Sequence, residues 1–245
     1  MKETQIMEFS TLFRDVFEKN GLEGYATEQN IHQFEKLTDL MLATNQNMNV
    51  TAITDVKKII PLHYADCVKA AAYIPRNATV LDVGCGGGFP ILPLAIVRPD
   101  LQITGLDSTE KKIRYVQQTG NVLGLSIHTI SARAEDVAKN SEYRDSFDVV
   151  IGRAVARLNV LDELCIPFVK VGGRFLAMKG AAGAEEHREA EVGIEKLSGQ
   201  TREVVEYDLF TSDAVENRTL IIVDKISRTP REYPRSFGVI KKRPL

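Results

Sequence analysis

Cysteine is scarce in this 245-residue sequence, and the three cysteines lie far apart. Cys67, Cys85 and Cys165 include no C-x-x-C pair, and the four histidines form no ligand-like cluster. The sequence therefore predicts neither a disulfide framework nor a zinc site or other metal centre. It favours a reducing, cytoplasmic setting.

Long apolar runs are also missing. No segment approaches the roughly 20 apolar residues that a membrane-spanning helix needs, and residues 1–10 lack the basic-then-apolar order of a signal peptide. With 44% apolar residues, the chain can still bury the core of one sizeable domain. We expect a soluble protein with no membrane partner; the sequence is silent on oligomeric state, and a monomer is the default expectation.

An excess of charge of one sign is absent overall, since the formal net charge is −2, but the charges are unevenly distributed. Residues 225–245 hold seven basic residues and one acid, which leaves 24 basic and 32 acidic residues in the rest of the chain. A basic tail on an acidic body suggests a polyanionic partner, because lysine and arginine displace counterions from phosphates. A merely solvated tail is the alternative.

Apolar periodicity changes near residue 75. Before that point, apolar residues at helical spacing, such as Phe9, Phe13 and Phe17, predict helices. Pro61 is expected to bend or break the third of these helices. From residue 79, short β-branched runs alternate with segments of helical length, which predicts a doubly wound, mostly parallel α/β sheet.

The last two of the seven predicted strands are not separated by a helix, so they should pair antiparallel at one edge of the sheet. Gly172 and Gly173 are interpreted as a tight turn before the fifth strand. The predicted domains are an N-terminal helical cap (1–75), a Rossmann-like domain (76–226) and a basic C-terminal tail (227–245).

The segment "VLDVGCGGGFP", residues 80–90, has the strand–glycine loop–helix layout of a nucleotide-cofactor site. Gly84 and Gly86 fit the first two positions of the dinucleotide fingerprint G-x-G-x-x-G, but Phe89 stands at the third. The dinucleotide pattern therefore fails by one residue.

Acidic residues at successive strand ends indicate a different cofactor. Asp82 would repel a pyrophosphate, whereas the sulfonium and ammonium groups of S-adenosylmethionine favour a nearby carboxylate. Asp107, 23 residues after Gly84, can accept hydrogen bonds from ribose hydroxyls, although with Ser108 it could equally start a helix. The candidate cofactor contacts are Asp82, Gly84, Gly86, Gly88, Phe89, Asp107, Ser108, Ala134 and Glu135, the last two flanking the adenine.

With these residues, the chain resembles the ribosomal RNA small subunit methyltransferase G family, also called glucose-inhibited division protein B. The matching segments run from about residue 48 to the end: "NVT", "HYADC", "DVGCGGGFP", "LDS", "RAED", "GRAVARL", "MKG" and "YPRSFGVIKKRPL". Cys67 and Gly152 depart from the family pattern without removing a charged or catalytic group.

The resemblance implies a class I methyltransferase with a seven-stranded sheet. It also implies that S-adenosylmethionine methylates N7 of one guanosine in the decoding-region loop of 16S rRNA, in the small ribosomal subunit. The residues that match the family's cofactor contacts are Gly84, Phe89, Ala134, Glu135 and Arg153.

The residues after the fourth predicted strand agree with this chemistry. Guanine N7 carries a lone pair and no proton, so its methylation needs no general base. "FDVVIG" runs into "RAVARL", not into the [DN]-P-P-[YF] segment of amino-group methyltransferases or a Pro-Cys nucleophile. Catalysis can then be mostly positioning, which can supply roughly 7–11 kcal/mol.

Basic residues at the fourth and fifth strand ends are the candidates to position the guanine. Arg153 and Lys179 could donate to guanine O6, to a phosphate or to the methionine carboxylate, and Arg153 could instead be a structural clamp on an acid. His63, Asp66 and Asn49 are expected at an RNA-facing rim. The candidate RNA contacts are Arg157, Arg228, Arg231, Arg235, Lys241, Lys242 and Arg243.

Two other functions stay open at this stage. A small-molecule methyltransferase would show no salt-sensitive affinity for RNA. A non-catalytic nucleotide-binding or ribosome-binding module would leave RNA unmodified.

Overall fold

The N-terminal helices form where the apolar spacing predicts them. A computed structural model describes residues 3–245, with side chains from residue 8 onward. Helix α1 (Glu3–Lys19) buries Phe9, Phe13 and Phe17, and the last two rings stack with centroids 3.9 Å apart. Thr27 caps the start of α2 (Glu28–Asn45) by accepting a hydrogen bond from the backbone N–H of Asn30; the short helix η1 (Glu23–Tyr25) precedes it.

The third helical segment continues through Pro61 in a widened turn. It consists of α3 (Val56–Ile59), the π-helical η2 (Ile60–Ala65), α4 (Asp66–Lys69) and η3 (Ala70–Tyr73). Proline cannot donate the backbone hydrogen bond of a regular α-turn, and π-helical turns frequently occur at functional sites. Here the widened turn carries His63 and leads directly into Asp66.

Seven strands form one mixed sheet in the order β3-β2-β1-β4-β5-β7-β6. The first five pair in parallel, and β7 pairs antiparallel with both β5 and β6. The predicted doubly wound sheet with antiparallel pairing at one edge is confirmed. The strands are β1 (Thr79–Val83), β2 (Gln102–Asp107), β3 (Ile127–Ser131), β4 (Phe147–Arg153), β5 (Val169–Gly180), β6 (Gly199–Phe210) and β7 (Val215–Lys225).

Helices cover both faces of the sheet. Successive strand residues point to opposite sides, so the apolar strands present side chains to a core on each face. Val80 packs with the core formed by α1, α2, α4, α5 and α6, whereas Leu81 packs with α8 and α9 on the other face. Among residues 3–245, no helix has both the length and the apolar character needed to cross a bilayer. The remaining helices are α5 (Ile91–Val97), α6 (Glu110–Leu123), α7 (Ala134–Val137), α8 (Leu158–Cys165), η4 (Ile166–Phe168), α9 (Gly183–Lys196) and α10 (Phe237–Lys242).

Gly172 and Gly173 lie inside β5, and not in a turn before it as expected. The strand begins at Val169, and its register against β4 jumps from the pair Phe147–Val169 to the pair Val149–Arg174. The glycines occupy the resulting bulge, where a Cβ on Gly173 would lie 2.6 Å from the carbonyl oxygen of Asp148. Gly172 has φ +83°, a conformation that glycine adopts readily.

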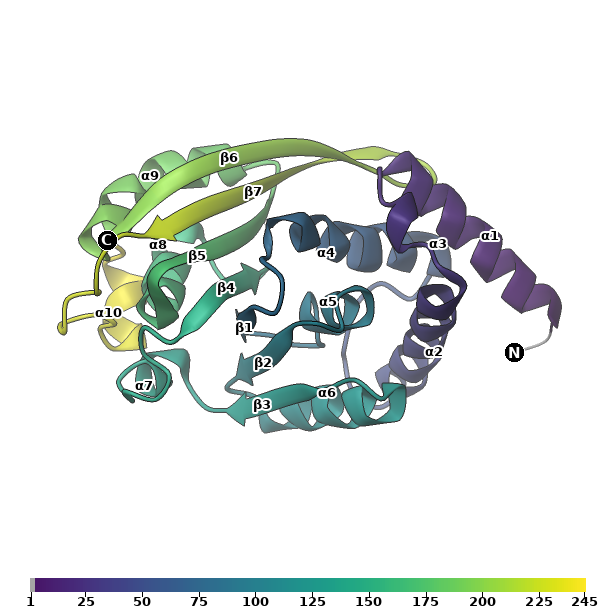
Figure 1. The fold of residues 1–245 in the computed structure, drawn as a ribbon, viewed down its shortest axis with the longest axis horizontal. Coiled ribbons are helices and arrows are strands. Elements are labelled where there is room, and N and C mark those ends of the chain that lie inside the picture. The colour runs from purple at the N-terminus through teal and green to yellow at the C-terminus, as the bar shows by residue number, and fades with distance from the viewer. Residues whose placement is uncertain (1–2) are drawn as a thin grey trace.

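The β6–β7 hairpin extends along one side of the molecule to reach α1 (Figure 1). Asn20 holds its far end: the Asn20 side chain donates to the carbonyl of Phe210 and accepts from the N–H of Phe210, at 2.9 and 3.0 Å. The N-terminal helices therefore contact the outer strand as well as the sheet face. The domain boundaries near residues 75 and 226 stay predictions.

Candidate functional site

Two cavities adjoin at the carboxyl ends of β1 and β4, where the strand order reverses and ligands bind in sheets of this type. The glycine-loop cavity, about 510 Å³, is lined by Gly84–Gly87, Phe89, Asp107, Ser108, Ala134, Glu135 and Phe237, among others. The lysine cavity, about 650 Å³, is lined by Asp66, Arg157, Lys179, Glu186, Glu216 and Arg218, among others. Both cavities share His63 and residues 153–155.

The positions of the glycine loop require glycine for different reasons. A Cβ on Gly84 would lie 2.7 Å from the side chain of Val155, and one on Gly88 only 2.3 Å from that of Leu92. A Cβ on Gly86 would meet only the carbonyl of Gly84, at 3.8 Å. Gly86 therefore borders open space, whereas Gly88, which does not line the cavity, permits the close packing of α5.

Asp107 bonds to the backbone near the start of α6 and also lines the glycine-loop cavity, whereas its hydrogen bonds to ribose hydroxyls stay a prediction. One carboxylate oxygen accepts from the N–H of Thr109, the residue before α6, at 2.8 Å, and the other accepts from the N–H of Gly86 at 3.0 Å. The side chain thus fixes the glycine loop against β2 while it lines the cavity, beside Ser108.

Asp82 is a buried carboxylate without a partner. It is fully buried in β1, and neither of its oxygens has a hydrogen-bond partner in the described part of the chain. Burial raises the pKa of this carboxyl well above its usual value; the Arg153 guanidinium opposes that shift and Asp107 adds to it. Asp82 lines neither cavity, so a direct contact between this carboxyl and a cofactor stays a prediction.

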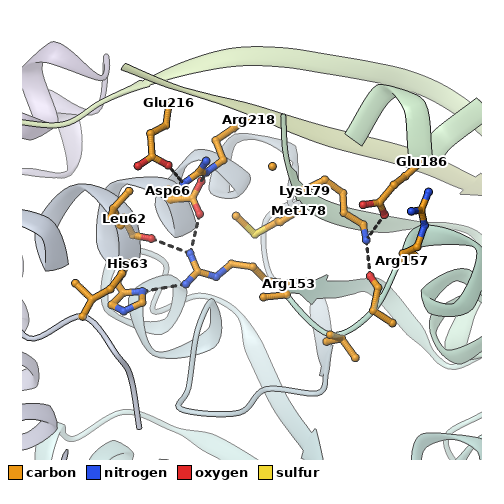
Figure 2. Close-up of a pocket in the computed structure, with 15 residues that line it drawn as sticks. Leu62, His63, Asp66, Arg153, Arg157, Met178, Lys179, Glu186, Glu216 and Arg218 are labelled. Atoms are coloured by element: carbon orange, nitrogen blue, oxygen red, sulfur yellow. Dashed lines mark hydrogen bonds and ion pairs between the residues drawn. The ribbon is translucent and has the colours of Figure 1, made fainter. Parts of the chain in front are cut away.

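Arg153, at the end of β4, joins the two cavities to the N-terminal helices. Its guanidinium donates to the carbonyl of Leu62 at 3.0 Å and to Asp66 at 2.7 Å, and it contacts His63 Nδ1 at 3.0 Å (Figure 2). The i, i+3 pair His63 and Asp66 therefore converges on one side chain. The structural-clamp interpretation of Arg153 matches these contacts.

His63 is held in one tautomer. Arginine can only donate, so Nδ1 must accept from Arg153, and Nε2–H then donates to Thr51 Oγ1 at 2.7 Å. Burial, together with the Arg153 charge, lowers the pKa of His63 to about 3. The ring also stacks on Phe89 with centroids 4.5 Å apart, so a neutral imidazole forms part of the cavity wall.

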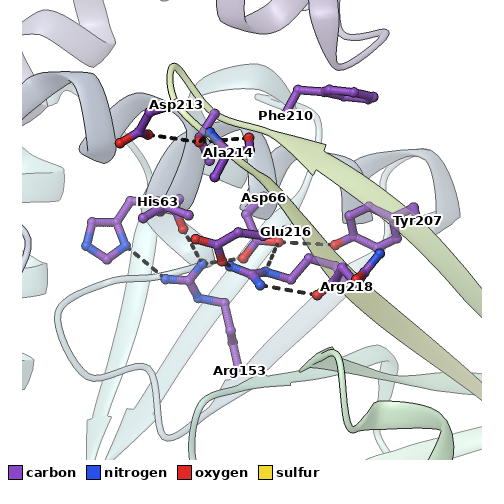
Figure 3. Close-up of polar contacts among 12 residues, drawn as sticks. His63, Asp66, Arg153, Tyr207, Phe210, Asp213, Ala214, Glu216 and Arg218 are labelled. Carbon is purple, nitrogen blue, oxygen red and sulfur yellow. Dashed lines mark hydrogen bonds and ion pairs between the residues drawn. The ribbon is translucent and has the colours of Figure 1, made fainter.

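The Asp66 carboxylate also contacts Tyr207 and Arg218, which the sequence analysis did not identify. Tyr207 on β6 donates to Asp66 at 3.1 Å, and Arg218 on β7 lies 3.5 Å from the same carboxylate oxygen and 2.6 Å from Glu216 (Figure 3). Tyr207 and Arg218 are cross-strand neighbours. No local spacing could have revealed them, because only the hairpin register brings them to Asp66.

Lys179 and Arg157 line the lysine cavity as expected. Lys179 donates to the carbonyl of Ala156 at 2.5 Å and pairs with Glu186 at 2.8 Å, with 8% of its side chain exposed. Arg157 is mostly exposed and pairs with Glu189. Glu186, the acidic partner in this cavity, is a second residue that the sequence analysis missed.

Asn49 is exposed and lies outside the lining of both cavities, although its neighbour Val50 contributes to the glycine-loop cavity. An RNA-rim role for Asn49 stays a prediction. No group of three His, Cys, Asp or Glu side chains within residues 3–245 is arranged as metal ligands.

The basic tail is docked on the domain, and its charges differ in exposure. The backbone and guanidinium of Arg235 both donate to Glu163, which is fully buried. Arg235 Nε and Nη2 are therefore engaged within the protein, and its RNA contact stays a prediction. The tail residues Arg228, Arg231, Lys241, Lys242 and Arg243 are exposed.

Comparison with known proteins adds relatives along nearly the whole chain. The family model described as rRNA small subunit methyltransferase G matches residues 30–212. The chain is 40% identical over 242 residues to the protein of that name from Clostridium perfringens, covering 98% of this chain and all of that one. It is 39% identical to the Brevibacillus brevis protein of the same name, covering 95% and 98%.

Among solved structures, TYW2 from M. jannaschii, crystallised in complex with AdoMet, superposes with a TM-score of 0.53 at 17% identity. The match covers 67% of this chain and 77% of that one, and it supports the fold alone. The sequence relatives carry the assignment, because they extend over the glycine loop, the β4 end and the tail together: this chain belongs to the rRNA small subunit methyltransferase G family.

Proposed function

We propose that the protein transfers a methyl group from S-adenosylmethionine to N7 of a guanosine in the decoding-region loop of 16S rRNA. The observation that carries this proposal is the adjacency of the two cavities across Arg153 and residues 154–155. One cavity suits a cationic nucleoside cofactor, and the other offers both a donor and an acceptor to a base.

The glycine-loop cavity fits the cofactor by the chemistry of its walls. Gly86 leaves room beside the backbone, and Asp107 faces the cavity at the end of β2. S-adenosylmethionine, when bound, supplies the electrophilic methyl group on its sulfonium.

The lysine cavity suits guanine. Lys179 can donate to O6, and its partner Glu186 can accept from N1–H and the exocyclic amine, a pattern that adenine and the pyrimidines do not match. A base reaches such a pocket when it is unstacked, which a single-stranded rRNA loop permits at low cost.

The surrounding residues support a reaction without a general base. Both ring nitrogens of His63 are engaged, Nδ1 by Arg153 and Nε2 by Thr51. Asp66 is occupied by Arg153, Tyr207 and Arg218. Attack by the N7 lone pair needs no proton removal, so these groups can act by holding the geometry.

The same proposal places the enzyme in the cytoplasm with the small ribosomal subunit as its partner. The exposed tail residues Lys241, Lys242 and Arg243 favour a polyanion. A monomer remains the expectation.

The deciding experiment supplies methyl-labelled S-adenosylmethionine with intact small subunits, naked 16S rRNA or small acceptors. We expect label in 16S rRNA, and mass spectrometry should place it as N7-methylguanosine at one site. Label only in small acceptors would establish the small-molecule alternative. No label in any acceptor, despite cofactor binding, would leave the non-catalytic module.

A further inference from the structure

The C-terminal tail reaches the cofactor side of the molecule. Phe237, the first residue of α10, lines the glycine-loop cavity together with Arg133, Ala134 and Glu135 from the segment after β3. The other main walls come from the loops that follow the parallel strands. Phe237 is therefore an aromatic wall contributed by a different part of the chain, and its helix α10 lies beside α7 and α8 in Figure 1.

Strong contacts hold this tail in place. Arg235, two residues before Phe237, binds Glu163 through its backbone N–H at 2.7 Å and through guanidinium contacts at 2.6–3.1 Å. The Glu163 side chain is 0% exposed, so this carboxylate needs a charged partner. Ile240, three residues after Phe237, is fully buried in the core that α8 and α9 form with one face of the sheet.

The ring of Phe237 is also restrained by its neighbours. The Arg133 guanidinium lies over it, 5.8 Å from the centroid, and Arg133 borders the same cavity. A restrained aromatic ring in the same cavity lining as Ala134 and Glu135 suits a flat heteroaromatic group, because stacking contributes affinity for any such ring.

We propose that Phe237 is the adenine-packing wall of the cofactor site, and that the Arg235–Glu163 pair is the clamp that positions it. This inference rests on the proposed use of S-adenosylmethionine. It assigns the tail two roles: its first turn completes the cofactor pocket, and its last basic residues stay available to RNA.

The test measures binding of S-adenosylmethionine, S-adenosylhomocysteine and adenosine by calorimetry. Phe237→Ala should weaken all three by a similar factor, roughly 10- to 100-fold, because each ligand carries the same adenine. Phe210→Ala, at the exposed hairpin end, removes an equivalent ring far from the cavity and should change none of them. Equal affinities in the wild type and Phe237→Ala would overturn the proposal.

A second variant tests the clamp. Arg235→Ala should weaken the same three ligands while Phe237 is intact, and the wild-type thermal transition serves as its folding reference. If Arg235→Ala unfolds the protein, the Phe237→Ala result alone decides. A wild type that binds no S-adenosylmethionine would end both this inference and the proposed function, whereas normal wild-type methylation with an unaffected Phe237→Ala would end only the inference.

Discussion

At the residue scale, Gly86 differs from the other glycines of the loop, because it borders open space and they pack against side chains. Gly84, Gly87 and Gly88 each face side chains that a Cβ would approach within 3 Å, but Gly86 does not. The open space beside Gly86 is therefore available to a ligand.

Gly86→Val should reduce S-adenosylmethionine affinity by at least about 100-fold, since the branched side chain fills that space. Gly86 has φ +53°, so the substitution also costs about 1–2 kcal/mol of stability. Gly124→Val is the matched control, because Gly124 has φ +67° and no atom within 4 Å of its Cβ. Calorimetry should show lost binding only for Gly86→Val. Equal affinities in both variants would contradict the position of the cofactor beside Gly86.

His63 makes stability depend on pH. Its folded pKa of about 3 lies below the ordinary 6.5, so below pH 6.5 the unfolded state takes up a proton that the folded state refuses. The stability associated with neutral His63 is thus present above pH 6.5 and decreases as the pH falls.

Between pH 6.5 and 5 this effect amounts to about 1.6 kcal/mol of unfolding free energy. His63→Gln removes the titrating ring and retains the other three histidines. Urea unfolding across this range should show the stability gap between wild type and His63→Gln shrinking as pH falls. Parallel pH profiles would contradict a buried, neutral His63.

At the scale of elements, the β6–β7 hairpin connects the sheet edge to the end of α1 and to Asp66. Its far end is tied to α1 through Asn20, and its middle presents Tyr207 and Arg218 to Asp66. The long hairpin therefore couples the N-terminal helix to the lysine cavity.

Asn20→Ala should lower the unfolding free energy by about 2 kcal/mol, because it removes both side-chain hydrogen bonds to the backbone of Phe210 and the side-chain donor to the buried carbonyl of Val16, which keeps the backbone N–H of residue 20. Asn217→Ala removes an exposed amide that donates to Asp208 at 2.9 Å and should cost under about 0.5 kcal/mol. Urea midpoints compare the two variants. A cost for Asn20→Ala no larger than that of Asn217→Ala would show that the tie is dispensable.

At the scale of the whole molecule, the basic tail lies far from α1 and α2 (Figure 1). Its last charges project from α10, whose opposite side is packed on the domain through Ile240. The tail can therefore present cations to RNA as a docked helix rather than as a free chain.

Neutralising Lys241, Lys242 and Arg243 together with glutamine should lower the salt slope of RNA binding by about 2–3 log-log units, if each contacts one phosphate. Cofactor affinity should not change. The triple substitution of Arg14, Lys19 and Lys36, which lie on α1 and α2, changes the net charge equally and serves as the control. A slope that falls equally in both triples would indicate a general charge effect and no tail contact.

Much of the site was predictable because its determinants are local. Short β-branched runs, the glycine loop and Asp107 are features of a few neighbouring residues each, so spacing alone predicted the sheet, the loop and the cavity beside it. His63 and Asp66 were predicted as a pair because one helical turn separates them.

The sequence by itself determined the parallel sheet, the N-terminal helices and the glycine loop, since backbone sterics and apolar periodicity are short-range constraints. Only the tertiary structure decided that Asp66 receives Arg153, Tyr207 and Arg218, and that Arg235 binds Glu163 while Phe237 lines the glycine-loop cavity. The physical reason is that a buried charge takes whichever counter-charge the strand register and tail docking bring near, and sequence separation does not encode that proximity.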